Sequence, residues 1–125
     1  MENSDSENNN KKVSNLDYLN EMMGGKKHLV KGIIDVFLVQ VPEELQTIND
    51  AIVKADYAII KSFAHTMRSS VSMLGISILA PVLLEMENLG ATATGIEKIK
   101  ELNQKLNEIS KQAIEEIEIA KLNYE

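Results

Sequence analysis

The chain has 125 residues, a length that suits one domain with a hydrophobic core. Hydrophobic residues make up 44% but aromatic residues only 4%, and apolar positions recur at helical spacing, which favours an all-α fold. A formal charge of -6 at pH 7 argues against a nucleic-acid partner, and the absence of cysteine excludes disulfides and thiolate metal sites. Because no stretch approaches the roughly 18 apolar residues of a membrane span, we expect a cytoplasmic protein with no membrane partner.

The N-terminal part of the chain is divided by composition. Residues 1–12 are polar, rich in Asn and without periodicity, so we predict a disordered tail in front of a domain at 13–125. Ser14 or Asn15 is placed to cap a short first helix, and the Gly-Gly pair after Met23 ends it. This helix is expected to be an extra element ahead of the main bundle.

A longer second helix is predicted from about residue 26 to Val41, with the broad apolar face of a buried helix. Pro42 lacks a backbone N–H, yet the two acidic residues after it suit the first turn of a continuation toward Ile52. We therefore expect the second helix to be kinked or split at Pro42.

The third segment can be capped by Asp56 and ended by Gly75 in a left-handed conformation. Helical periodicity separates its side chains onto two faces. The apolar arc contains Ile59, Ile60, Phe63, Met67, Ser70 and Leu74. The opposite face contains Lys61, His65, Arg68 and Ser72. His65 is therefore predicted to face solvent.

Two further helices complete the chain. The first is expected to start near Ser77, to tolerate Pro81 in its first turn and to end at Gly90. Thr94 and Glu97 have the spacing of a capping box, which predicts a long last helix reaching about residue 123.

The last helix has apolar residues at alternating intervals of three and four, which produces a continuous seam. These residues are Ile99, Leu102, Leu106, Ile109, Ala113, Ile117 and Ala120. The seam can pair with a second copy as a coiled coil, or it can pack inside an antiparallel bundle. The bundle is favoured because each of the other helices needs the same kind of partner, so we predict an up-and-down helical bundle with short loops.

The exposed histidine is the main chemical candidate. A solvated imidazole keeps a neutral fraction near neutral pH, with one ring nitrogen free to attack an electrophile. Small residues surround His65 at Ser62, Ser69 and Ser72, and Arg68 one turn later can offset the charge of a phosphoryl group. A phosphoryl acceptor is the hypothesis that follows. His28, which lacks such a setting, is interpreted as an ordinary surface residue.

The sequence AHTMRSS at 64–70, followed by Leu74 and Gly75, resembles the signature of histidine-containing phosphotransfer (HPt) domains of multistep phosphorelays. Residues 19–42 resemble the first two helices of that family, and residues 85–90 resemble the end of the helix beside the active histidine. The resemblance implies a four-helix bundle in which His65 accepts a phosphoryl group from a receiver-domain aspartate and passes it to another receiver.

The resemblance also implies the partners. They are response-regulator receiver domains and a hybrid histidine kinase, and the domain has no catalytic activity of its own. It needs no cofactor, because magnesium is expected on the receiver. We expect a monomer, and Met1 with its short polar tail favours a free-standing protein over a piece of a hybrid kinase.

The resemblance also suggests roles for residues around His65. Arg68 occupies a position where the family usually has Lys or Arg, whereas Ser69 replaces a frequent Gly and can narrow the approach of a receiver or donate a hydrogen bond. Glu87 occupies a position on the adjacent helix where the family often has an amide or other hydrogen-bonding residue that orients the imidazole. A carboxylate close to the ring would stabilise its protonated form and repel the phosphoryl group.

Apolar residues near this region suggest a docking patch. Leu84 is expected near the polar side of its helix, and Ile76 follows the third helix directly. Scattered exposed apolar residues are also normal on protein surfaces, so an ordinary surface position is the alternative for both.

Two other functions remain open. The chain can be a non-catalytic helical adaptor that docks signalling partners through the same face. It can also be the dimerisation and phosphoacceptor domain of a sensor kinase, although Thr66 stands where those domains usually have an acidic residue and no ATP-binding domain follows.

Overall fold

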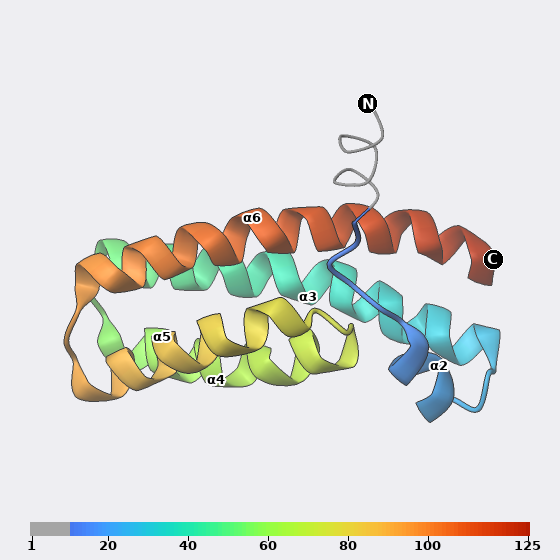
Figure 1. Ribbon diagram of the computed structural model, residues 1–125, viewed down its shortest axis with the longest axis horizontal. Coiled ribbons are helices and arrows are strands. Elements are labelled where there is room, and N and C mark those ends of the chain that lie inside the picture. Colours follow the sequence, from blue (N-terminus) through green and yellow to red (C-terminus); the bar gives the residue numbers. More distant parts are fainter. Residues whose placement is uncertain (1–10) are drawn as a thin grey trace.

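The computed structural model describes residues 11–125, and within this range it contains helices and no strand. The α-helices are α2 (Asp17–Met22), α3 (Lys27–Val53), α4 (Tyr57–Met73), α5 (Ala80–Thr92) and α6 (Ile96–Lys121). Two short 3-10 helices, η1 (Ser77–Leu79) and η2 (Leu122–Tyr124), adjoin α5 and α6. The four long helices lie alongside one another, and α2 lies at one end (Figure 1). The predicted all-α bundle with a short extra helix is confirmed.

The predicted tail falls mainly outside the described residues, which begin at Lys11. The carbonyl of Lys11 accepts a hydrogen bond of 3.0 Å from Nε2 of Gln112. The boundary between tail and domain therefore stays a prediction.

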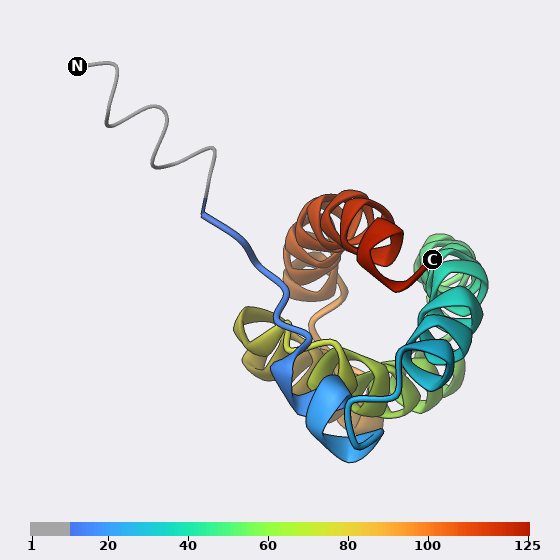
Figure 2. The same ribbon diagram turned by 90° about the vertical axis from the view of Figure 1, so that its right-hand side faces the viewer.

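The four long helices are arranged in a ring in the end-on view (Figure 2). Their buried side chains form one core cluster. Each helix contributes aliphatic side chains that are fully buried. The largest are Ile34 and Ile48 of α3, Ile60 and Met67 of α4, Leu83 and Met86 of α5, and Ile99, Leu106 and Ile117 of α6. Burying one such side chain stabilises the fold by about 1.5–3 kcal/mol, so this core supplies the main driving force for folding.

The α6 seam is buried within its own chain. Ile99, Leu102, Leu106, Ala113 and Ile117 are all 9% exposed or less, whereas Ile109 and Ala120 are half-buried. The bundle interpretation is therefore confirmed, because the residues that a coiled-coil dimer would use are already packed in the core of the same chain.

The second predicted helix is not split. α3 runs unbroken through Pro42, whose side chain is exposed, while Val41 and Leu45 on either side are buried. A proline inside a helix loses one hydrogen bond. Here the turns before and after Pro42 are both packed against the core, so packing keeps the helix continuous at the proline.

Some helices end where the sequence predicts and others do not. Asp56 caps α4 as predicted, accepting a hydrogen bond of 3.2 Å from the N–H of Ile59. Gly75 takes a left-handed conformation with φ of 66°, directly after α4 ends. The predicted capping box at Thr94 is wrong, because the N-cap of α6 is Gly95 and Thr94 bonds instead to Thr92 at 2.8 Å.

Gly90 does not end its helix, contrary to the prediction. It lies inside α5 and is buried against α4, where a Cβ atom would lie 3.0 Å from the backbone nitrogen of Lys61. The glycine is therefore explained by packing, since its missing side chain lets the two helix backbones approach closely.

The segment before α2 is tied to the C-terminal part of α6. Both carboxylate oxygens of Glu116 accept from the N–H of Val13, at 3.1 and 3.0 Å, and Glu116 also accepts from the N–H and hydroxyl of Ser14. The predicted cap of α2 is wrong, because its N-cap is Leu16, which makes no side-chain cap hydrogen bond. The side chain of Asn15 accepts from the N–H of Asp17 at 2.8 Å, and Ser14 bonds to Glu116. We call these contacts of Glu116 with Val13 and Ser14 the Glu116 clasp.

Substituting Gly90 tests the close approach of α4 and α5. Alanine favours helices over glycine by up to about 1 kcal/mol, but overpacking a rigid site costs about 1–3 kcal/mol. Gly90→Ala is therefore expected to lower the free energy of unfolding in urea, by about 1 kcal/mol net.

The matched control is Gly32→Ala, because Gly32 is also inside a long helix but a Cβ atom added to it would have no neighbouring atom within 4 Å. This variant should raise stability by up to about 1 kcal/mol. Equal gains at the two positions would show that α4 and α5 do not constrain Gly90.

Candidate functional site

His65 projects from the outer face of α4. Ala64 and Met67, its neighbours on the inner face, are 0% and 1% exposed, whereas the side chain of His65 is 68% exposed. The apolar and polar faces of α4 are thus separated as the helical periodicity predicts. The packed face fixes the position of the helix and leaves the imidazole accessible to a partner.

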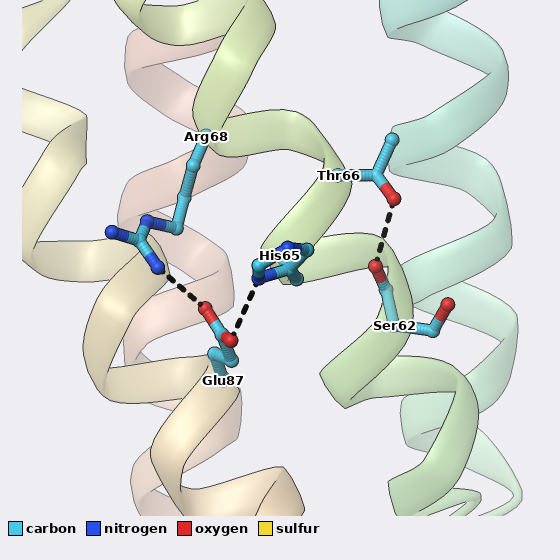
Figure 3. A network of polar contacts seen from close by, with 5 residues as sticks. All are labelled: Ser62, His65, Thr66, Arg68 and Glu87. Carbon is cyan, nitrogen blue, oxygen red and sulfur yellow. Dashed lines mark hydrogen bonds and ion pairs between the residues drawn. The ribbon is translucent and has the colours of Figure 1, made fainter.

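A single carboxylate from α5 joins His65 to Arg68. Oε2 of Glu87 lies 2.8 Å from Nδ1 of His65, and Oε1 accepts a hydrogen bond of 2.9 Å from Nη1 of Arg68. Figure 3 shows Glu87 between the two side chains of α4. The Glu87 side chain is 17% exposed and so is the least solvated of the three. We call His65, Arg68 and Glu87 the site triad.

The charge state of Glu87 fixes the hydrogen-bond roles within the site triad. The hydrogen bond from His65, followed by that from Arg68, holds the pKa of Glu87 below its ordinary value, so this group is ionised at neutral pH. An ionised carboxylate can only accept hydrogen bonds, so Nδ1 of His65 must carry the proton. In the neutral imidazole, Nε2 then holds the free lone pair.

Arg68 has part of its hydrogen-bonding capacity left. Its side chain is 44% exposed, and one of its five N–H donors is used by Glu87. The guanidinium is therefore already oriented beside His65, and its remaining donors can bind an anion.

The remaining predicted site residues lie in different settings. Ser69 and Ser72 are exposed on α4, and Leu84 on α5 is 42% exposed, one turn before Glu87. The prediction for Ile76 is wrong, because this side chain is 4% exposed and packs in the core. The left-handed turn at Gly75 redirects the chain, so the residue that follows points inward rather than toward a partner.

A groove between α3 and α4 borders His65 on the side away from Glu87. Phe37, Gln40 and Glu44 of α3 line it, together with Thr66 and Ser69 of α4. Ser69 is the one predicted site residue besides His65 that this groove includes.

Glu44 was not predicted as part of this region. It is 7% exposed, its Oε1 has no hydrogen-bond partner, and burial raises the pKa of its carboxyl group. The sequence did contain a signal for this burial. Glu44 falls on the same helical stripe as Val41, Leu45 and Ile48, and a residue within an apolar stripe is expected to be buried.

No cluster of three or more His, Cys, Asp or Glu residues that could hold a metal ion occurs within residues 11–125. The same part of the chain contains no helix with both the length and the apolar character needed to cross a bilayer. His28 is exposed at the start of α3, as predicted.

Substituting Glu44 tests the cost of burying its carboxyl group. The raised pKa means that ionisation is harder in the folded state, so stability falls as pH rises from the unfolded value, about 4.3, through the folded value. Glu44→Gln should therefore raise the thermal midpoint at pH 7 by a few degrees, and the gain should disappear below about pH 4.

Glu43→Gln is the control, since Glu43 is exposed next to Glu44 on the same helix. It should leave the midpoint unchanged at both pH values. A gain for Glu44→Gln that persists unchanged in acid would contradict the burial argument.

Comparison with known protein families identifies the family of the chain. A family model described as "Hpt domain" matches residues 32–118, which include the whole site triad. Searches of curated proteins and of solved structures found no match. The matched segment covers well over half of the chain. The chain therefore belongs to the Hpt domain family, whose members carry out histidine phosphotransfer in two-component phosphorelays and interact with receiver domains and histidine kinases.

Proposed function

We propose that His65 is the phosphoryl acceptor, and that the domain carries the phosphoryl group from the aspartate of one receiver domain to the aspartate of another. One observation carries the assignment. His65 is an exposed imidazole whose Nδ1 is bound by Glu87, so that Nε2 holds a free lone pair. The second histidine, His28, has no hydrogen bond to an acidic residue in the described part of the chain.

The transfer needs few groups from this chain. Nε2 of His65 attacks the phosphorus atom of the aspartyl phosphate, the P–O bond breaks, and the electron pair remains on the receiver's carboxylate. Transfer to a second receiver is the reverse reaction. Positioning and charge stabilisation supply most of the catalysis in phosphoryl transfer, so a histidine held on a rigid bundle is sufficient when the partner supplies the remaining groups.

We assign the magnesium ion to the receiver. Glu87 is the one carboxylate bonded to His65, and Arg68 and His65 already occupy both of its oxygens. A hard cation such as magnesium prefers several free oxygen ligands. We further propose that the chain is a cofactor-free, monomeric intermediate in the cytoplasm, without catalytic activity of its own. The burial of the α6 seam within the same chain supports the monomer.

The receiver is proposed to dock over His65. The groove residues Phe37 and Ser69 border the imidazole, and Leu84 is exposed on α5 one turn before Glu87. Ser69 is well placed to limit which receivers approach, because its side chain lines the groove next to the reacting ring.

The acceptor assignment is tested by label transfer from a phosphorylated receiver domain. Acid-labile, base-stable label should appear on the wild-type chain and on His28→Gln, and it should be absent from His65→Gln. Transfer that survives His65→Gln would sink the assignment. If His65→Gln still binds the receiver, the loss reflects chemistry and not docking.

Arg68 is tested in the same assay. Charge-assisted hydrogen bonds contribute about 1.5–3 kcal/mol, so Arg68→Ala should slow transfer by about tenfold or more while the helical circular dichroism spectrum stays unchanged. Lys111→Ala removes the same charge from the exposed surface of α6 and serves as the control. Equal rates for the two variants would show that only net charge matters.

A further inference from the structure

We propose that Glu44 is a specificity-determining residue, and that the groove between α3 and α4 receives a basic side chain, arginine or lysine, from the docked receiver domain. This inference rests on the proposed transfer between His65 and a receiver. It assigns a function to a buried carboxyl group that takes no part in the transfer itself.

The groove has an exposed polar rim and a buried floor. The rim residues are Gln40 of α3 and His65, Thr66 and Ser69 of α4. Glu44 lines the same groove but is 7% exposed, so it belongs to the floor. The hydroxyl of Thr66 donates to the carbonyl of Ser62 at 3.0 Å and is therefore not free to bond Glu44 (Figure 3).

The carboxyl group of Glu44 lacks a hydrogen-bond donor. Its Oε1 is buried and has no partner in the described part of the chain. A buried acceptor without a partner is unfavourable, because it has lost its contacts with water and gained none in exchange. A donor that the receiver inserts into the groove would compensate for this cost in the complex.

The charge of the groove favours a cation as the donor. Apart from His65, Glu44 is the one ionisable residue that lines the groove, and no lysine or arginine of this chain lines it. Arg68 is bonded to Glu87 of α5 instead. An ionised carboxylate at a poorly solvated position attracts a cation more strongly than it would on the open surface.

The apolar lining suits the stem of a long basic side chain. Phe37 and Met73 also line the groove, and both are partly buried and packed against the core. Lysine and arginine pack their methylene groups on such surfaces and keep the charged end beside a polar group. A guanidinium can in addition stack on an aromatic ring and bind a carboxylate through two parallel hydrogen bonds.

The position of the groove gives this contact a role in partner choice. Because His65 lines the same groove, a side chain that reaches Glu44 enters next to the reacting imidazole. A receiver with an apolar or acidic residue at the matching position would leave Glu44 buried without a partner. Such a receiver would therefore be disfavoured by the cost of this unpaired group.

The first test follows the charge state of Glu44 by NMR. It uses the full chain, labelled with ¹³C at the glutamate carboxyl groups, and a receiver domain whose phosphorylated form transfers label to His65. The signal of Glu44, assigned by its absence in Glu44→Gln, is titrated with pH in the free chain and in the complex. A cation in the groove should lower the pKa of Glu44 by about 1 pH unit or more on binding. An unchanged or raised pKa would overturn the proposal, because it would mean that no cation reaches the carboxyl group.

The second test compares affinity with stability. Glu44→Gln should raise the dissociation constant for the receiver by about tenfold or more in calorimetric titrations, while the thermal midpoint of the free chain rises. A structural defect would lower stability and affinity together. Glu43→Gln, which changes an exposed neighbour, should leave the dissociation constant unchanged. Equal dissociation constants for the two variants would overturn the proposal.

A double-mutant cycle identifies the partner side chain and separates the two levels of the proposal. One arginine or lysine of the receiver, when changed to methionine, should weaken binding to the wild-type chain but not to Glu44→Gln. If no basic residue behaves in this way while His65 still accepts label, the role of Glu44 is overturned and the acceptor assignment stands. If the label appears equally on His65→Gln, the proposed function itself is overturned.

Discussion

The close approach of α4 and α5 is the constraint on which the site depends. The two helices run in opposite directions, and Gly90 brings the α5 backbone against Lys61 of α4. One turn later in α4 and one turn earlier in α5, the same approach places Glu87 beside His65. A side chain at Gly90 would separate the helices at the point where a hydrogen bond of 2.8 Å has to form. Packing in the core and chemistry on the surface are thus coupled through one glycine.

The site triad and the core have different roles. The core residues stabilise the fold through buried area, whereas exposed ion pairs contribute little because water screens them. Changes in His65, Arg68 or Glu87 are therefore expected to alter chemistry with little effect on folding. A domain built this way can vary the groups around its histidine without losing the bundle that positions them.

Local signals in the sequence were sufficient for most of the helices. Asp56 caps its helix through a residue three positions away, and the α6 seam follows from periodicity alone. His65 was placed on the solvent side by the same periodicity, and the family resemblance supplied its chemistry.

Features that depend on residues distant in the sequence were harder to predict. Gly90 was interpreted as a helix end because the feature that requires a glycine there, the nearby backbone of Lys61, lies on another helix. Ile76 was placed on the surface because the inward turn after Gly75 is a tertiary effect. The sequence also offered no way to determine that Glu87 bonds His65 and Arg68 at once, since this depends on the relative position of two helices.

The Glu116 clasp shows that the folding unit extends beyond the segment by which the family is identified. Desolvation opposes ionisation of Glu116, but hydrogen bonds from Ser14, Val13 and Gln112 outweigh it and lower the pKa of the carboxyl group. A fragment trimmed to residues 32–118 would retain Glu116 and lose both of its partners before α2. It would also lose Leu19, which is fully buried, and so leave one end of the core open to water. Domain boundaries taken from the family match alone would therefore yield a less stable protein that still contains His65.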